Sequence, residues 1–99
     1  MNILKELNFN NDKPAIFSVH KSDGINIVAI GLKENQTVSK HKTSLPTLLT
    51  VLKGKISFSI EGETFELFEF DTYHIPVQIE HELTGLEMEN MVQLVQDKK

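Results

Sequence analysis

The sequence predicts an all-β protein, folded as a sandwich or barrel of short antiparallel strands. Apolar and polar residues alternate in several short stretches, most clearly where serines separate Ile56, Phe58 and Ile60. This alternation is the pattern of a strand with one buried face. Turn sequences containing Gly54 or Gly62 divide such stretches at intervals of roughly eight to twelve residues. Strands of this length and spacing are typical of β-sandwiches and β-barrels.

The individual strands are predicted in order along the chain. Alternation indicates a strand at 15–21, and a fuller apolar run at 25–32 follows a Ser-Asp-Gly turn. The segment 90–96 has apolar residues at spacings that suit either a helix or a strand, and the β-branched Val92 and Val95 favour a strand. Further strands are expected at 45–52, 56–60, 64–68, 73–76 and 79–84.

The N-terminal residues predict a short helix. Ile3, Leu4 and Leu7 share one helical face, with Lys5 outward, and an Asn-rich segment at 8–12 ends the pattern. We expect this segment to cap the core or to fray. A strand exchanged with a partner subunit is the further alternative.

Length, composition and charge exclude several classes of protein. Ninety-nine residues predict one domain spanning 1–99, with the barrel core at about 25–96. The chain has no cysteine, which excludes disulfides and thiolate metal sites. The net charge is −4 and the chain has no arginine, so it lacks the basic face that nucleic-acid binding requires. It has neither a signal-peptide pattern nor an apolar run of membrane-spanning length, and we expect a soluble cytoplasmic protein.

The region from about 27 to 96 resembles a small single-domain cupin, an RmlC-like jelly-roll β-barrel also described as a double-stranded β-helix. The first motif of that family has a histidine pair, then a glutamate, then a glycine at the next hairpin. His41 matches the first histidine, and Gly54 matches the glycine. Thr43 and Thr47 stand where the second histidine and the glutamate are expected.

The second motif of the family has a glycine, a proline, another glycine and a histidine. Pro76 and His81 match the proline and the histidine. Phe70 and Gln78 replace the two glycines, and Asp71 follows the first position as is common in the family. The resemblance therefore implies the cupin jelly roll as the fold.

The same resemblance implies a metal site that has lost part of its ligand set. Zn, Fe, Mn or Ni in such a site needs at least three firm protein ligands and an open position for substrate. His41 and His81 supply two imidazoles, whereas a neutral threonine hydroxyl is a poor ligand. We expect no tightly held cofactor, with a weakly bound divalent ion at His41 and His81 as the alternative. His74 is a candidate third ligand, but strand parity predicts that its side chain points outward.

Without a metal, the same positions form a polar pocket for a small ligand. Tyr73 and Ile75 are predicted to point inward, and Met88 and Met91 to fill gaps in the barrel. The pocket is predicted to consist of His41, Thr43, Thr47, Tyr73 and His81.

The predicted function is binding of a small organic molecule in the barrel, with no catalytic residue and no reaction assigned. The alternative is a metal-dependent cupin enzyme of the dioxygenase or isomerase type with an atypical site. Beyond the small molecule, the expected partner is a second copy of the chain in a homodimer, and neither nucleic acid nor a membrane. The candidate interface residues are Ile3, Leu4, Leu7, Phe68 and Phe70.

Overall fold

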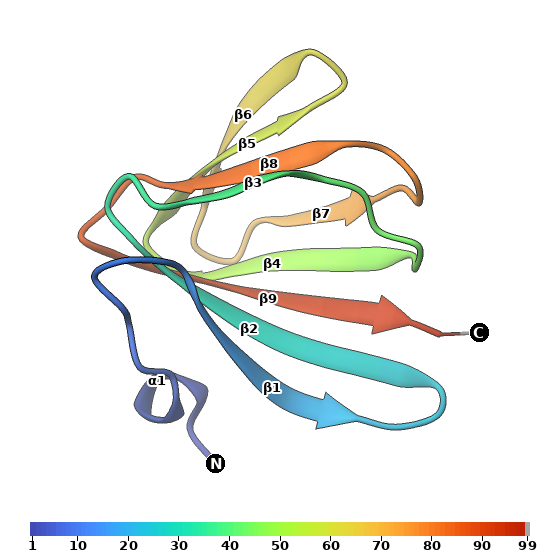
Figure 1. Cartoon of the computed structure of the whole chain (residues 1–99), viewed down its shortest axis with the longest axis horizontal. Helices are drawn as coiled ribbons and strands as arrows, with labels where there is room; N and C mark the ends of the chain where they lie inside the picture. The colour runs from blue at the N-terminus through green and yellow to red at the C-terminus, as the bar shows by residue number, and fades with distance from the viewer. Residues whose placement is uncertain (99) are drawn as a thin grey trace.

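Nine strands and one short helix make up the described part of the chain, residues 1–98 of the computed structural model. The bounds are α1 Ile3–Glu6, β1 Ala15–Lys21, β2 Ile25–Lys33, β3 Thr37–His41, β4 Thr47–Lys53, β5 Lys55–Ile60, β6 Glu63–Phe68, β7 Thr72–Ile75, β8 His81–Gly85 and β9 Glu89–Asp97. The strands form two antiparallel sheets, in the orders β1-β2-β9-β4-β7 and β3-β8-β5-β6. Figure 1 shows the two sheets wrapping around a common interior, which is the predicted jelly roll.

Alternation along the strands decides which side chains fill that interior. In β5, Ile56, Phe58 and Ile60 are buried while the residues between them are half-exposed. Because the opposite sheet contributes the same kind of alternate residues, the two inner faces meet in one apolar cluster. Its buried members are Ile30, Leu32, Leu49, Val51, Ile56, Phe58, Ile60, Leu67, Ile75, Leu83 and Val92.

The strand predictions are confirmed along most of the chain, and 90–96 is a strand, within β9. The sequence missed β3, an edge strand of its sheet in which four of the five side chains are exposed, because such a strand carries little apolar alternation. The strands predicted to begin at 45 and 79 begin at Thr47 and His81.

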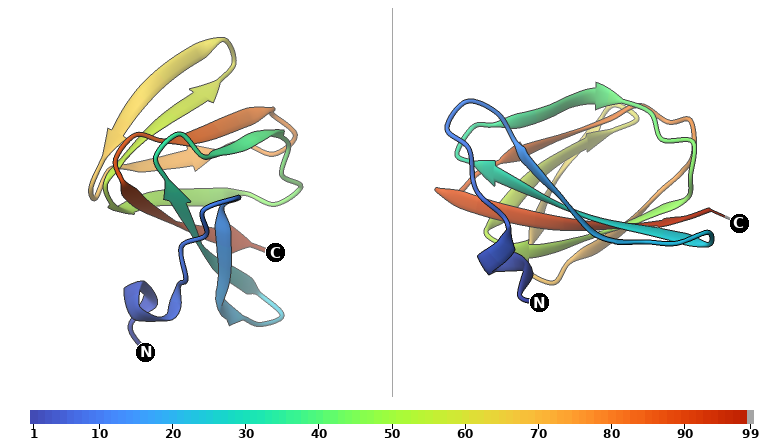
Figure 2. Two further views of the ribbon diagram at one scale, coloured as in Figure 1. Left: turned by 60° about the vertical axis from the view of Figure 1, so that its left-hand side comes forward. Right: turned by 60° about the horizontal axis from the view of Figure 1, so that its bottom comes forward.

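The N-terminal helix is confirmed as α1, with Asn2 as its N-cap. Figures 1 and 2 show α1 outside the barrel. Leu7, directly after it, packs with Ala29 and Met91 in a second cluster on the outer face of the larger sheet. The segment thus caps an apolar sheet face. No helix within 1–98 is long and apolar enough to cross a membrane.

Three apolar predictions need correction. Leu7 is buried in its own chain, so it cannot contribute to a subunit interface as proposed from the sequence. Met91 belongs to the outer cluster, and Met88 is 81% exposed on the turn before β9, so neither lines the barrel. Leu4 and Phe70 remain exposed, and the homodimer remains a prediction.

A buried asparagine ties the two sheets together at one end of the barrel. Asn90 is fully buried, and its amide nitrogen donates to the Leu32 and Glu87 carbonyl oxygens, each at 2.9 Å. Its amide oxygen accepts from the Lys55 N–H at 2.9 Å and from the Glu87 N–H at 3.1 Å. All four hydrogen-bonding positions of the side chain are therefore used.

Two glycines leave room for that side chain. Gly54, in the β4–β5 turn, has a φ of +79°, and a Cβ there would meet Asn90 Oδ1 and would lie 2.7 Å from the Glu89 carbonyl oxygen. At Gly85, a Cβ would lie 2.5 Å from Asn90 Nδ2 and 2.9 Å from the Lys33 carbonyl oxygen. The turn glycine predicted from the sequence is thus also a packing requirement.

Replacing Asn90→Ala is expected to destabilise the fold by about 3 kcal/mol, because buried backbone groups of three segments lose their partner. Urea unfolding measures this. Asn26→Ala is the matched control, since its amide makes one side-chain bond, to Gln96, in a partly buried place, and about 1 kcal/mol is expected there. Equal losses in the two variants would contradict the role given to Asn90.

Gly54→Ala and Gly62→Ala separate backbone strain from crowding. Both glycines have positive φ, +79° and +78°, but a Cβ at Gly62 would meet nothing within 4 Å. We expect about 1 kcal/mol of destabilisation at Gly62 from strain alone, and at least about 2 kcal/mol more at Gly54 from overpacking. The difference in unfolding free energy between the two variants is the quantity to measure.

Candidate functional site

The two histidines singled out from the sequence lie side by side at the opposite end of the barrel from Asn90. His41 ends β3 and His81 begins β8, and the two are directly opposite in the antiparallel pairing. Their ring centroids are 4.2 Å apart and the ring planes are tilted by 57°. His81 is buried and His41 is exposed.

Backbone carbonyl groups set the orientation of both rings in the same way. His41 Nδ1 lies 3.0 Å from the Ser39 carbonyl oxygen, and His81 Nδ1 lies 3.1 Å from the Ile79 carbonyl oxygen. Because a carbonyl oxygen only accepts, each Nδ1 must carry the proton, which leaves Nε2 of the neutral ring with a free lone pair. The site thus presents two imidazole acceptors side by side.

The position of His81 disfavours its charged form. Burial lowers the pKa of His81 below its ordinary value of 6.5. The hydrogen bond to the Ile79 carbonyl opposes this change, and the neighbouring His41 adds to the lowering of the pKa. Near neutral pH, His81 is therefore an acceptor at Nε2.

Aromatic side chains lie beneath the pair. The Phe58 ring lies 5.9 Å from the His81 ring and 4.8 Å from the Tyr73 ring, centroid to centroid. Tyr73 is half-buried, as the strand parity of β7 predicted, and it also contacts Phe65 at 5.9 Å. Phe58 is fully buried, so side chains fill the barrel next to His81. The end of the barrel at which His41 and His81 lie is called the mouth below.

The two threonines bend the chain between β3 and β4. The hydroxyls of Thr43 and Thr47 both donate to the Leu45 carbonyl oxygen, at 3.1 and 2.9 Å. Thr43 Oγ1 also accepts from the Leu45 N–H. The hydroxyl protons are therefore committed to the loop, and the threonines can offer a ligand only oxygen lone pairs.

Open space at this end reaches only part of the predicted pocket. A hollow of about 430 Å³ between the β5–β6 turn and the start of β8 includes His81. Lys40 and the carboxylates of Glu61, Glu63, Glu80 and Glu82 share it. His41, Thr43, Thr47 and Tyr73 do not line this hollow. The sequence did not predict this hollow, since nothing in the strand pattern marks it.

The donor set does not fit a firmly bound metal. Within residues 1–98, no group of three or more His, Cys, Asp or Glu side chains converges in a way that could hold an ion. His74 is exposed, as strand parity predicted, on the outer face where it pairs with Leu48. The two imidazoles thus have no third protein ligand in the described chain.

Comparison with solved structures identifies the fold. A cupin superfamily protein from Desulfitobacterium hafniense superposes with a TM-score of 0.88 at 14% identity, covering 100% of this chain and 90% of that chain. The chain folds as a cupin. No family sequence model and no curated protein sequence matches it.

Other solved structures with a similar fold differ in what is known of them. A protein of unknown function from Streptococcus pyogenes, SPY1581, has a TM-score of 0.85 at 22% identity, covering 100% of this chain and 86% of that chain. The DMSP lyase DddQ from Ruegeria pomeroyi has a TM-score of 0.79 at 16% identity, covering 87% of this chain and 47% of that chain. At these identities the likeness shows the fold alone.

The backbone at the two positions that the resemblance assigns to motif glycines has the conformation that favours glycine. Phe70 and Gln78 have φ values of +73° and +62°. Positive φ is the conformation that glycine adopts without strain. In addition, Gln78 N–H donates to the Thr43 carbonyl oxygen at 2.8 Å.

The lowered pKa of His81 predicts acid sensitivity. In the unfolded chain His81 is protonated as the pH falls below its ordinary pKa of 6.5, whereas in the folded chain it is protonated only at a lower pH. The free energy of unfolding therefore falls as the pH drops through 6.5 and on toward the folded pKa. Urea unfolding at about pH 7.5 and about pH 5 should show a larger loss for the wild type than for His81→Gln. The exposed-site control His74→Gln should retain the wild-type dependence. An identical acid loss in wild type and His81→Gln would rule out this linkage.

Proposed function

We propose that this cupin binds a small polar organic molecule at the His41–His81 mouth without using a metal. The observation that supports this is the pair of imidazoles 4.2 Å apart, each held by a backbone carbonyl at Nδ1. Two adjacent acceptors of fixed orientation are suited to a ligand with neighbouring hydrogen-bond donors. Because the rings are already oriented, little ordering accompanies binding.

The surroundings narrow the class of ligand. The hollow beside His81 contains four carboxylates and one lysine, so an anionic ligand would be repelled. Ser59 and Thr64, whose hydroxyls are 3.0 Å apart, add further polar groups. A neutral polyol or a small hydroxylated amine has the donors that this site requires.

A panel of sugars, polyols, amino alcohols and organic acids should test the proposal by thermal shift and NMR titration. A neutral or cationic member is expected to shift the ring signals of both histidines. Its affinity should fall about tenfold in the double variant His41→Ala/His81→Gln, which removes one imidazole acceptor and replaces the other with a freely rotating amide. His20→Ala/His74→Ala is the matched control, because both of these histidines are exposed on β1 and β7. The proposal would be contradicted if no member of the panel bound, or if the affinity fell equally in the two double variants.

A metal-dependent enzyme, of the dioxygenase or isomerase type, is the second candidate. The observation that favours it is that both Nε2 atoms are free while both Nδ1 atoms are bonded to carbonyls, which is how metal-ligating histidines are commonly supported. No reaction step follows from two ligands alone. Metal analysis of untagged protein separates the candidates: stoichiometric Zn, Fe, Mn or Ni that survives a mild chelator would favour the enzyme and contradict metal-free binding.

A further inference from the structure

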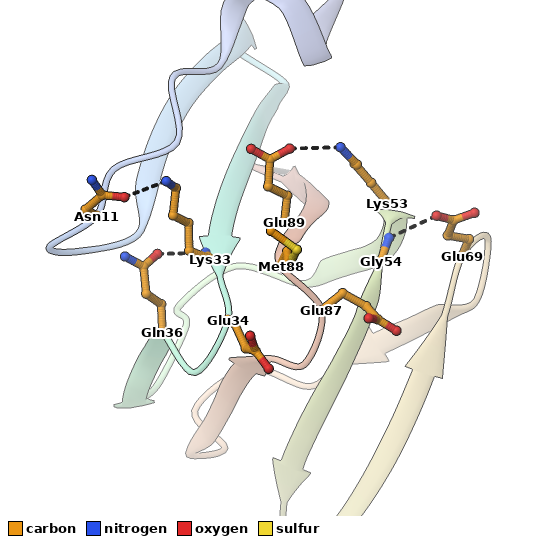
Figure 3. Close-up of a pocket in the computed structure, with 10 residues that line it drawn as sticks. All are labelled: Asn11, Lys33, Glu34, Gln36, Lys53, Gly54, Glu69, Glu87, Met88 and Glu89. Atoms are coloured by element: carbon orange, nitrogen blue, oxygen red, sulfur yellow. Dashed lines mark hydrogen bonds and ion pairs between the residues drawn. The ribbon is translucent and has the colours of Figure 1, made fainter.

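A second hollow lies at the opposite end of the barrel, around the turns that Asn90 holds. It is a groove of about 760 Å³. Figure 3 shows side chains from the N-terminal segment and from several turns facing it. The lining residues used below are Lys33, Glu34, Lys53, Glu69, Glu87 and Met88. Gly54 is the one residue of the cupin motifs that lines this groove, and the residues of the proposed mouth site do not line it.

Cations of the chain itself already lie in the groove. The Lys53 ammonium is paired with Glu89 at 3.0 Å, and the Lys33 ammonium donates to Asn11 Oδ1. In the adjoining hollow, the Lys55 ammonium lies 5.7 Å from the centroid of the Phe68 ring. Each of these lysines is therefore engaged with an acceptor or an aromatic face.

Two carboxylates of the groove have no such partner. Glu34 and Glu87 are exposed, and among residues 1–98 no hydrogen bond or ion pair of their side chains is present. In Figure 3 no dashed line reaches either carboxylate, whereas Glu69 accepts from the Gly54 N–H at 2.9 Å. Negative charge at the groove thus exceeds the positive charge of the chain's own lysines there.

Exposed apolar side chains flank these carboxylates. Met88 is 81% exposed within the groove. Phe68 is 52% exposed and lines an adjoining hollow that shares Gly54, Glu69 and Glu87 with the groove. The surface therefore offers apolar contacts near the acidic groups.

Hydrogen bonds from Asn90 hold the backbone of the groove in place at Glu87. Asn90 bonds both the N–H and the carbonyl of Glu87, and it also holds the Lys55 N–H at the start of β5. A partner that binds here does not need to order the turn, which lowers the cost of association.

We propose that this groove docks a short extended segment of a partner protein that carries lysine or arginine beside bulky apolar residues. Basic side chains would pair with Glu34 and Glu87, and apolar ones would contact Met88 and Phe68. A second copy of this chain fits the surface poorly, because its net charge is −4 and the same carboxylates would face each other. A small polyamine would satisfy the charges but leave both apolar contacts unused.

Fluorescence anisotropy with a labelled, end-capped peptide of alternating Lys and Leu tests the proposal. Binding is expected to weaken with salt. Affinity should fall about fivefold in Glu34→Gln/Glu87→Gln. It should also fall in Met88→Ser, without a change in salt dependence. The matched control Glu6→Gln/Glu66→Gln removes the same charge from exposed positions of α1 and β6, outside both hollows, and should bind as the wild type does.

Each other outcome would overturn the proposal. Equal losses in the two glutamine pairs would mean that the peptide responds to net charge alone. If spermine displaced the labelled peptide at the same concentration as the unlabelled peptide does, and Met88→Ser did not change the affinity, the groove would be assigned to a small amine. If sedimentation experiments showed a dimer, and Glu34→Gln/Glu87→Gln changed its dissociation constant, the groove would be assigned to a second copy of the chain. All these substitutions are at exposed positions, and an unchanged thermal unfolding transition verifies that each variant folds.

Discussion

The architecture depends on one buried polar side chain. Asn90 connects β9 and β2 of the larger sheet with β5 of the smaller one, and it has no hydrogen-bonding position left over. A buried amide is tolerated only when it is fully bonded, so the surrounding segments must keep one arrangement. The close approach also explains why positions 54 and 85 have no side chain. Apolar burial holds the sheets together, whereas this network determines how they meet at one end.

The two ends of the barrel are consequently built differently. At the Asn90 end, backbone groups are joined through a side chain, and the turns there are held in place. At the other end, Phe58 fills the barrel and the imidazoles of His41 and His81 lie above it, each bonded to the backbone carbonyl two residues before it in the chain. A ring that is oriented through Nδ1 in this way retains its Nε2 for other molecules. The polar groups at the open end are thus available for binding, whereas those of Asn90 are fully used by the fold.

Much of the fold was predictable because strand alternation and the spacing of a few motif residues, such as Gly54 and His81, are local signals. The resemblance singled out His41 and His81 but not how their rings are arranged, whereas the outward side chain of His74 followed from parity. Asn90 was not predictable, since an asparagine after a Glu-rich turn looks like a surface residue until three distant segments surround it. The hydrogen bonds from the Thr43 and Thr47 hydroxyls to the Leu45 carbonyl oxygen were likewise not predictable, because they depend on how the loop folds.

The environment of Thr47 explains how the barrel stays stable without a metal ligand there. Its side chain is 5% exposed, and its hydroxyl is bonded to the Leu45 carbonyl. A carboxylate in that place would be buried beside a carbonyl oxygen, and it would require a cation to offset its lost hydration. The neutral hydroxyl donates to the same carbonyl and leaves no charge to compensate. A threonine here therefore leaves no buried charge that requires a cation.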